Sequence, residues 1–405
     1  MTDSAGIPGG TGTAGGGSKP PRSRRRRLLR WIGLGSAFVV LAGSATGWWL
    51  YNKLDGNITE DTSAASELRR YERDRPAHFA NGAQNILLIG SDSRSGRDNA
   101  RYGQDRGTQR SDTTILLHVP ADRRSATAVS IPRDLMTEIP ECLMADGSRT
   151  REQRAQFNWA FQWGGAGCTI RTAERLTGIR IDHHMVLDFG GFKKMVDAIG
   201  GVEVCLKQPI DDSEAKLRLP AGRQTLQGEQ ALGFVRARYS LGNGSDTERM
   251  ERQQQFLGSL VKKVQSNGVL LNPARLYPLL DAATSSVTTD PGLASLRGLY
   301  ELVRGVRDIP TDQIKFLTVP RKPYSADPNR DELVEPDAAR LFQQLRADQP
   351  VTVAPPKPEN GIEPVEATPS GAPRDGAGRT DGGTTGTPVP VPTFTGTTAG
   401  MADCR

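Results

Sequence analysis

The chain has 405 residues, of which 36% are hydrophobic, and it contains 45 glycines and 27 prolines. Because glycine and proline concentrate towards the two ends, this composition excludes one packed globule that uses the whole length. The formal net charge is +6 and rests mainly on arginine. This bias reflects either a GC-rich genome or bidentate recognition of phosphate and carboxylate groups.

The N-terminal part predicts a membrane anchor. Residues 1–30 begin rich in Gly, Ser and Thr and end in an arginine run, which predicts a disordered, basic segment on the cytoplasmic side. Residues 31–52 carry no charge and end in aromatic residues. A membrane-spanning helix needs ~20 apolar residues and places aromatic side chains at the interfaces. A cleaved signal peptide with a site near Ala45 is the alternative, but the length and the terminal aromatics favour an uncleaved helix.

This anchor places everything after residue 52 outside the cytoplasm in a single-pass topology. Residues 53–80 are polar and predict a stalk with one short helix, before a folded domain over 81–350. Residues 351–405 are rich in Pro, Gly and Thr and predict a disordered tail. Truncation after Pro350 should then leave activity largely intact. The topology also argues against nucleic acid as a partner.

Three short apolar runs, 86–89, 114–117 and 128–131, each predict a buried strand. The short link between the second and third runs favours a hairpin and antiparallel pairing. Charged residues stand at the ends of the runs that would then meet at one edge of the sheet. They are Asp92 and Arg94, Arg110 and Asp112, and Arg133 and Asp134.

Helical periodicity continues the pattern along the chain. It predicts helices over 168–176, 188–199, 246–266, 272–283, 291–305 and 337–347. Alternation predicts strands over 202–206 and 315–319. Residues 226–238 are ambiguous: 230–235 fit a short helix or a strand, and a helix that brings Arg236 and Arg238 to its end is favoured. Strands that alternate with helices define an α/β fold, a central mixed β-sheet flanked by helices.

The helix over 246–266 brings a second set of polar residues. Ser245 to Glu248 form a capping-box pattern, and the helix start offers free amides and a dipole that suit an anion. Asp246, Arg249, Arg252 and Gln253 share one helical face. Each single arginine is otherwise typical of solvated surface, and Asp246 of a helix cap.

Asp92 and Asp112 suit a hard cation such as Mg²⁺, which binds one or two carboxylates and bridges to substrate phosphates. The alternative is that each carboxylate pairs with a neighbouring arginine. His118, His183 and His184 form no triad with Ser or Cys and are interpreted as structural. The residues thus predict an extracytoplasmic, arginine-rich site for a pyrophosphate or phosphodiester with a divalent metal.

The chain has four cysteines, which allow three disulfide connectivities. Cys142 and Cys168 lie in the same excursion of the domain, so this disulfide is favoured, which leaves Cys205 and Cys404. Cys205 is alternatively a buried thiol. A zinc site is not expected, because no CxxC or spaced His pair accompanies the cysteines.

Five motifs stand in a characteristic order, and together they resemble the LytR-CpsA-Psr (LCP) family of bacterial cell-wall proteins, with a tail and cysteines of the actinobacterial type. They are Gly90–Arg94 (G-x-D-x-R), Arg110–Thr113 (R-S-D-T), Ile131–Asp134 (I-P-R-D), Arg236–Arg238 (R-x-R) and Asp246–Gln254 (D-x-x-R-x-x-R-Q-Q). The resemblance covers roughly 85–265 and continues weakly to about 345. The glycine-rich spacer between Arg238 and Asp246 and the arginine-bearing loop after Arg94 depart from the family pattern.

The resemblance implies a phosphotransferase that attaches a glycopolymer from a polyprenyl-pyrophosphate carrier to peptidoglycan through a phosphodiester. It implies Mg²⁺ held by Asp92 and Asp112, and an apolar tunnel for the polyprenyl chain. It implies pyrophosphate contacts from Arg110, Arg133, Arg236, Arg238 and Arg249, with Asp246 and Gln253 or Gln254 nearby. A pyrophosphatase side activity would use the same groups.

Some roles and functions stay open at this point. Arg94 and Arg252 are further candidates for substrate binding, and Asp134 is either the general base or a support for an arginine. A non-catalytic binder of anionic glycopolymer or lipid pyrophosphate, and a membrane-bound regulator of envelope stress, remain as alternatives to the enzyme.

Overall fold

The computed structural model describes residues 22–79, 81–92, 111–237, 246–266, 272–355 and 392–401, without the side chains of 22–28, 246–248 and 273. The chain divides into two units, Met1–Lys53 and Leu54–Arg405. Each unit is described by itself.

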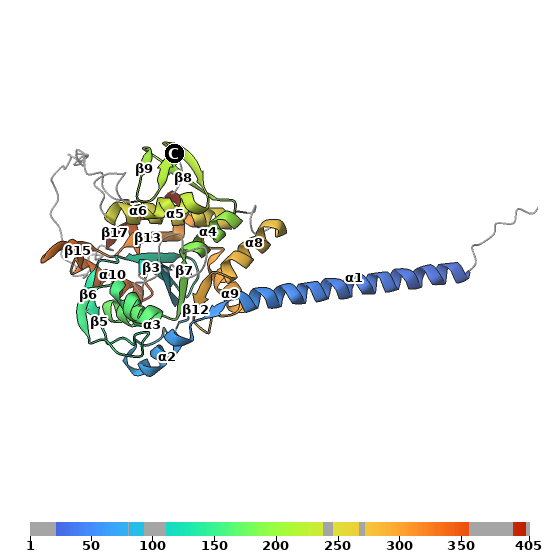
Figure 1. Ribbon diagram of the computed structural model, residues 1–405, viewed down its shortest axis with the longest axis horizontal. Coiled ribbons are helices and arrows are strands. Elements are labelled where there is room, and N and C mark those ends of the chain that lie inside the picture. Colours follow the sequence, from blue (N-terminus) through green and yellow to red (C-terminus); the bar gives the residue numbers. More distant parts are fainter. Residues whose placement is uncertain are drawn as a thin grey trace, which may run out of the picture. The chain divides into compact units, whose positions relative to one another are not determined.

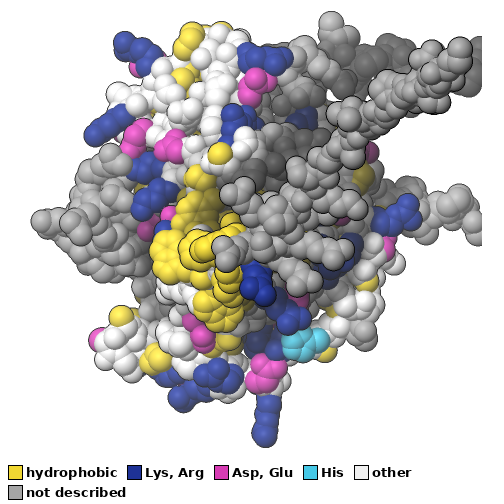
Figure 2. Space-filling view, turned by 90° about the vertical axis from the view of Figure 1, so that its right-hand side faces the viewer, with side chains coloured by type: hydrophobic (Ala, Val, Ile, Leu, Met, Phe, Trp, Pro, Cys, Tyr) yellow, Lys and Arg dark blue, Asp and Glu magenta, His cyan; other side chains and the backbone are white. Residues whose placement is uncertain are grey.

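The first unit contains most of helix α1 (Arg22–Asn57). Its segment Leu29–Asn57 has a mean hydropathy of 1.3 and is long enough to cross a membrane, and it includes the predicted anchor over 31–52. Its large hydrophobic side chains, such as Phe38 and Trp48, are exposed. Figure 2 shows a face on which hydrophobic side chains gather in a band with Lys and Arg side chains beside it. The helix fits the predicted anchor by length and composition.

The second unit is organised around a 9-stranded mixed sheet (Figure 1). In spatial order its strands are β1 (Thr59–Glu60), β12 (Val287–Thr289), β7 (His183–Asp188), β2 (Gln84–Ser91), β3 (Ser111–Val119), β4 (Ala126–Ile131), β13 (Ile314–Thr318), β17 (Thr393–Thr398) and β16 (Thr352–Ala354). Four two-stranded sheets accompany it: β5 (Met136–Ile139) with β6 (Gln153–Gln156), β8 (Val202–Leu206) with β11 (Gly222–Leu226), β9 (Ile210–Asp212) with β10 (Leu217–Leu219), and β14 (Arg321–Tyr324) with β15 (Asp327–Leu333).

The three strands predicted from apolar runs lie at the centre of this sheet. Strand β3 pairs antiparallel with both β2 and β4, which confirms the predicted hairpin. Strand β7 pairs parallel with β2, and β13 pairs parallel with β4. The α/β class with a central mixed sheet is therefore confirmed.

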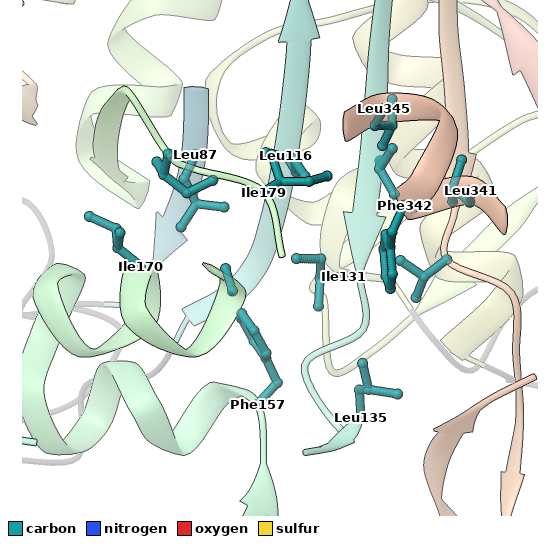
Figure 3. Close-up of a cluster of buried hydrophobic side chains, with 14 of the residues drawn as sticks. Leu87, Leu116, Ile131, Leu135, Phe157, Ile170, Ile179, Leu341, Phe342 and Leu345 are labelled. Carbon is teal, nitrogen blue, oxygen red and sulfur yellow. The ribbon is translucent and has the colours of Figure 1, made fainter. Parts of the chain in front are cut away.

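Helices cover both faces of the sheet. On one face α3 (Asn158–Thr177) and α10 (Asp337–Arg346) pack on the sheet, and Figure 3 shows Ile170, Phe157 and Phe342 against Leu87, Leu116 and Ile131. On the other face lie α4 (Phe189–Ala198), α5 (Gly228–Arg236), α6 (Asp246–Gln265), α8 (Pro273–Thr284) and α9 (Leu296–Val306). Alternate strand residues such as Ile86 and Ile115 serve this second core.

Helix α3 is longer than the predicted 168–176. It starts at Asn158, and non-helical angles at Gly164 and Gly165 interrupt it. Gly165 has φ of +58°, a left-handed conformation that glycine adopts without a Cβ penalty. The glycine-rich sequence before Cys168 therefore forms part of a kinked helix.

The predicted stalk over 53–80 is wrong as a separate segment. Leu54 and Ala64 are buried, and α2 (Thr62–Arg70) packs against α3. The guanidinium of Arg75 binds the buried Glu174 carboxylate at 2.6 Å. This segment has few apolar residues, but its charged residues pair with buried partners from the domain. Its polar composition therefore resembled that of a stalk.

The prediction of a disordered tail over 351–405 is wrong for its described residues. Strand β16 begins at Thr352, and β17 inserts between β13 and β16. Phe394 of β17 is 7% exposed and joins the main core. The composition did not predict this strand, because the strand has no hydrophobic periodicity. Backbone hydrogen bonds and one buried phenylalanine hold it in the sheet.

The cysteines and histidines agree with their interpretation as structural residues. Cys142 and Cys168 form a disulfide with a Cα–Cα distance of 5.5 Å. Cys205 is also disulfide-bonded rather than a buried thiol, and Cys404 lies outside the described residues. His183 contacts Asp290 at 3.1 Å, and His184 lies 3.5 Å from Asp61.

Candidate active site

Strand register brings the predicted charges together at one edge of the sheet. Gly90 pairs with Thr113 and Ser91 with Ser111 across β2 and β3, while Thr114 pairs with Ile131 across β3 and β4. Asp92, Asp112 and Arg133 therefore stand at the same end of three adjacent strands. Gly90 allows this close pairing, because a Cβ there would lie 3.3 Å from the Cβ of Thr113.

Arg133 lies between two carboxylates. Its Nη1 donates to Oδ1 of Asp112 and its Nε donates to Oδ2 of Asp134, both at 3.1 Å. All three side chains retain some exposure, 22% for Arg133, 31% for Asp112 and 17% for Asp134. The guanidinium is thus oriented by its neighbours and still accessible to an anion.

A second group of cations comes from α5 and α6. Arg236 ends α5, and its Cζ lies 4.8 Å from the ring centroid of Phe189, a cation–π contact that helps to orient the guanidinium. Arg249, in the first turns of α6, is 6% exposed. Both arginines line the same cavity as Asp112 and Arg133.

This apolar cavity has a volume of about 1110 Å³ and lies between the sheet and helices α4, α5, α6, α8 and α9. Besides the arginines, its wall is made mainly of aliphatic and aromatic side chains, among them Leu88, Ile115, Met185, Phe192, Leu232, Phe256, Leu257, Leu279, Leu280, Leu299 and Val303. The arrangement combines guanidinium groups that can bind an anion with a mainly apolar lining. Such a cavity suits an amphiphile with a phosphate head and a hydrocarbon tail.

The last residues of the D-x-x-R-x-x-R-Q-Q motif have diverging positions. Arg252 is buried and its Nη2 donates to the carbonyl of Ala237, so it holds the end of α5. It lines neither the apolar cavity nor the second hollow that is described next. The Nε2 of Gln253 donates to the carbonyl of Val235 at 3.1 Å. These two bonds hold the backbone on either side of Arg236. The contact of Arg252 therefore differs from the substrate contact predicted for it.

Gln254 points away from the apolar cavity. Its Nε2 donates to Oγ1 of Thr318 at 3.1 Å, and the residue lines a second hollow of about 1120 Å³. Arg133 lines this hollow as well. Its other walls come from β14, β15, the start of α10 and β17, segments in which sequence patterns indicated no site.

Several predicted site residues lie outside the described residues. They are Arg94, Arg110 and Arg238, together with the side chain of Asp246, although α6 begins at Asp246 as expected. Asp92 is described and half-buried at the end of β2. The part of the chain that the structure describes therefore assembles Asp92, Asp112, Arg133, Asp134, Arg236, Arg249, Gln253 and Gln254.

The donor set is compatible with the Mg²⁺ that the resemblance implies. Within the described residues no group of three or more His, Cys, Asp or Glu side chains forms a metal cage. Mg²⁺ commonly uses one or two carboxylates and completes its shell with water and substrate phosphate. Asp112 lines the apolar cavity and Asp92 directly follows β2 at the same edge of the sheet, so these two carboxylates are the residues that would hold the ion.

The fold and the site define an α/β protein with one N-terminal helix that is long and apolar enough to cross a membrane, and with arginines and a carboxylate in the wall of an apolar cavity. The model of the LytR-CpsA-Psr family matches residues 55–348, and the chain belongs to this family.

Named relatives show the same relationship. The chain is 34% identical over 307 residues to the cell wall biosynthesis protein LcpA of Corynebacterium glutamicum, covering 70% of this chain and 58% of that protein. It is 26% identical over 304 residues to the polyisoprenyl-teichoic acid–peptidoglycan teichoic acid transferase TagT of Bacillus subtilis, covering 72% and 88%. The chain thus spans less than two thirds of LcpA.

Solved structures agree on the fold. The structure of TagT bound to LI-WTA covers 68% of this chain and 97% of its own, with a TM-score of 0.51 and 22% identity. TagV of B. subtilis covers 67% and 98%, with a TM-score of 0.52 and 23% identity.

Proposed function

We propose that this protein is a membrane-anchored phosphotransferase that attaches a glycopolymer from a polyprenyl-pyrophosphate carrier to peptidoglycan through a phosphodiester. The observation that carries the proposal is that Arg133, Arg236 and Arg249 line the same apolar cavity. A pyrophosphate would lie among these guanidiniums and the polyprenyl chain would fill the cavity. The name of TagT, a polyisoprenyl-teichoic acid–peptidoglycan teichoic acid transferase, supports this chemistry, and the name of LcpA supports a role in cell wall biosynthesis.

Residues at the start of the second unit hold two of the helices that line the cavity. The amide of Leu296 donates to Oδ1 of Asp55 at 2.8 Å, and Nδ2 of Asn57 donates to Oδ1 of Asp281 at 3.2 Å. Asp55 and Asn57 are the last residues of the candidate span, and they hold the helices α9 and α8 that line the cavity. Tyr300 and Val303 of α9 are 58% and 47% exposed, and exposed apolar side chains of this kind are typical of amphipathic helices that bind a membrane surface.

The orientation is part of the proposal. The arginines of α1 precede the apolar segment, and basic residues remain on the cytoplasmic side. The catalytic domain would then face outward, where the disulfide of Cys142 and Cys168 is stable. Protease treatment of intact cells tests this orientation, and protection of the domain would contradict it.

The reaction exchanges a phosphoanhydride bond for a phosphoester bond. A hydroxyl oxygen of the acceptor attacks the phosphorus that bears the glycopolymer, and the bond from that phosphorus to polyprenyl phosphate breaks. Polyprenyl phosphate leaves, and a base takes the hydroxyl proton. The arginines stabilise charge that develops on the phosphoryl oxygens.

Asp134 is the proposed base, since its Oδ2 already accepts from Arg133 and the residue faces the second hollow. When bound at Asp92 and Asp112, Mg²⁺ would neutralise phosphate charge.

The test uses the full chain in detergent with a glycosylated polyprenyl pyrophosphate, Mg²⁺ and peptidoglycan fragments. Release of polyprenyl phosphate is the readout. Arg133→Ala should slow transfer by roughly tenfold to a hundredfold, because a charge-assisted bond contributes about 1.5–3 kcal/mol. Arg133→Lys should restore only part, since lysine lacks the planar fork.

Arg223→Ala is the matched control, because Arg223 is an exposed arginine paired with Glu203 at 2.9 Å and lines neither cavity. If the wild type shows no turnover and its lipid binding persists in EDTA, the enzyme proposal is wrong, and a non-catalytic binder or regulator is favoured.

A further inference from the structure

The second hollow, which we call the hairpin cleft, is separate from the apolar cavity and has a different chemistry. It is lined by the β14–β15 hairpin (Arg321–Tyr324 and Asp327–Leu333), by α6 and the start of α10, and by β17. We propose that the hairpin cleft binds the acceptor, a neutral N-acetylated glycan strand, and this inference rests on the proposed function.

The two hollows meet at Arg133. Arg133 lines both, whereas Asp112 lines the apolar cavity and Asp134 lines the hairpin cleft. The guanidinium that binds both carboxylates therefore stands between the two compartments. A phosphate bound by Arg133 is accessible from either side.

In-line displacement assigns the two compartments to the two partners of the reaction. In phosphoryl transfer the attacking and leaving oxygens lie on opposite sides of the phosphorus. The leaving group is polyprenyl phosphate, and only the apolar cavity suits its chain. The attacking hydroxyl then arrives from the opposite side of Arg133, which is the side of the hairpin cleft. Asp134 lies on this side, where a proton acceptor is needed.

Buried amides in the cleft point to a ligand rich in hydroxyl and amide groups. Gln156, Asn158 and Gln254 are 7%, 2% and 4% exposed and all line the cleft. The side-chain oxygen Oδ1 of Asn158 is buried and has no hydrogen-bond partner among the described residues. A buried carbonyl oxygen without a donor is unfavourable, so it favours a ligand that brings a hydroxyl or an amide N–H.

The backbone ties this amide to the reaction centre. The amide N of Asn158 donates to the carbonyl oxygen of Arg133 at 3.0 Å. Asn158 is also the first residue of α3, in a segment whose glycines kink the helix a turn and a half later. A sugar that donates to Oδ1 of Asn158 would therefore bind a residue whose backbone is hydrogen-bonded to that of Arg133, the residue proposed to hold the phosphate.

The charge of the cleft argues for a neutral strand rather than a polyanion. Its basic side chains are largely matched by acids: Arg321 binds Asp331, Arg330 lies 3.9 Å from Asp134, and Arg340 lies 3.2 Å from Asp337. Apolar groups such as Met250, Pro323 and Phe394 alternate with these polar ones. Amides, hydroxyls and small apolar patches are the features that a chain of acetamido sugars recognises.

The C-terminal strand completes this site. Residues 393–397 of β17 form one wall of the cleft, although more than two hundred residues separate them from Arg133. Figure 1 shows β17 beside β13, on the side of the domain where β15 and α10 lie. The cleft is therefore incomplete without the end of the chain.

The experiment measures the affinities of the full-length protein in detergent for two probes. One probe is a soluble, uncharged oligomer of N-acetylglucosamine, and the other is geranylgeranyl pyrophosphate with Mg²⁺. Asn158→Leu removes the amide at similar volume, and Arg340→Ala alters the exposed rim of the cleft. Both should weaken glycan binding at least tenfold and should change the affinity for the lipid pyrophosphate less than twofold. The control Arg223→Ala should change neither.

The outcomes separate this inference from the proposed function. If the variants bind the glycan like the wild type, or weaken a glycosylated lipid donor instead, the acceptor assignment is overturned. Glycan binding that weakens in Arg340→Ala with an unchanged thermal midpoint supports it even if Asn158→Leu fails to fold. Failure of the wild type to transfer glycopolymer would refute the proposed function, while the glycan titration would still test the cleft.

Discussion

Phe394 offers a sharp test of whether the end of the chain belongs to the folded domain. It is 7% exposed and lies in the core with Leu317, Val351 and Leu341. Its strand β17 pairs with β13 from Lys315↔Thr398 to Leu317↔Gly396. Replacement by alanine removes an aromatic ring from a site that backbone pairing holds in place, so the surroundings collapse only partly.

Substitution Phe394→Ala should lower the free energy of unfolding by about 3 kcal/mol, the lower end of values for buried phenylalanine because β17 lies near the sheet edge. This is a large fraction of the ~5–15 kcal/mol by which domains are stable. The assay is urea denaturation of the full-length protein in detergent, followed by near-UV circular dichroism. Thr395→Ala, on the exposed side of the same strand, should cost no more than about 0.5 kcal/mol. Equal losses in the two variants would refute the packing of β17, and truncation after Pro350 would then be harmless.

Three further predictions concern other parts of the domain. Replacing Cys142 and Cys168, which are 26 residues apart, by alanine should lower the free energy of unfolding by about 3 kcal/mol, and a denaturation midpoint unchanged from the wild type would contradict this. Burial lowers the pKa of His183, but the hydrogen bond and charge of Asp290 outweigh it and raise the pKa overall. Stability from this pair is therefore present below the unfolded pKa of about 6.5 and is lost as pH rises through the folded pKa, so His183→Gln should flatten that decline in a pH series of melts, and parallel curves would refute the assignment. Leu280→Trp should fill part of the apolar cavity and weaken binding of geranylgeranyl pyrophosphate while inorganic pyrophosphate binds as before; an unchanged lipid affinity would place the chain elsewhere.

Much of one half of the site could be predicted from sequence because it depends on local pattern. Apolar runs that end in charges gave the β2–β3–β4 edge with Asp92, Asp112 and Arg133, and the capping box gave the start of α6. The direction of individual side chains could not be predicted. Arg252 and Gln254 stand two residues apart on α6, but Arg252 caps the end of α5 and Gln254 faces the hairpin cleft. Which neighbour each one meets depends on helix packing.

The sequence by itself determined the anchor segment, the α/β class and the central strands, since these follow from hydrophobic period and length. It also predicted which residue types would carry the proposed phosphate chemistry. Only the tertiary structure decided that residues 53–80 and the C-terminal strand belong to the domain, because their few apolar side chains are buried by partners distant in sequence. It likewise decided that Arg133 stands between an apolar cavity and a polar cleft. Each cavity is lined by side chains from several helices and strands that are distant in sequence, so no local sequence pattern predicts it.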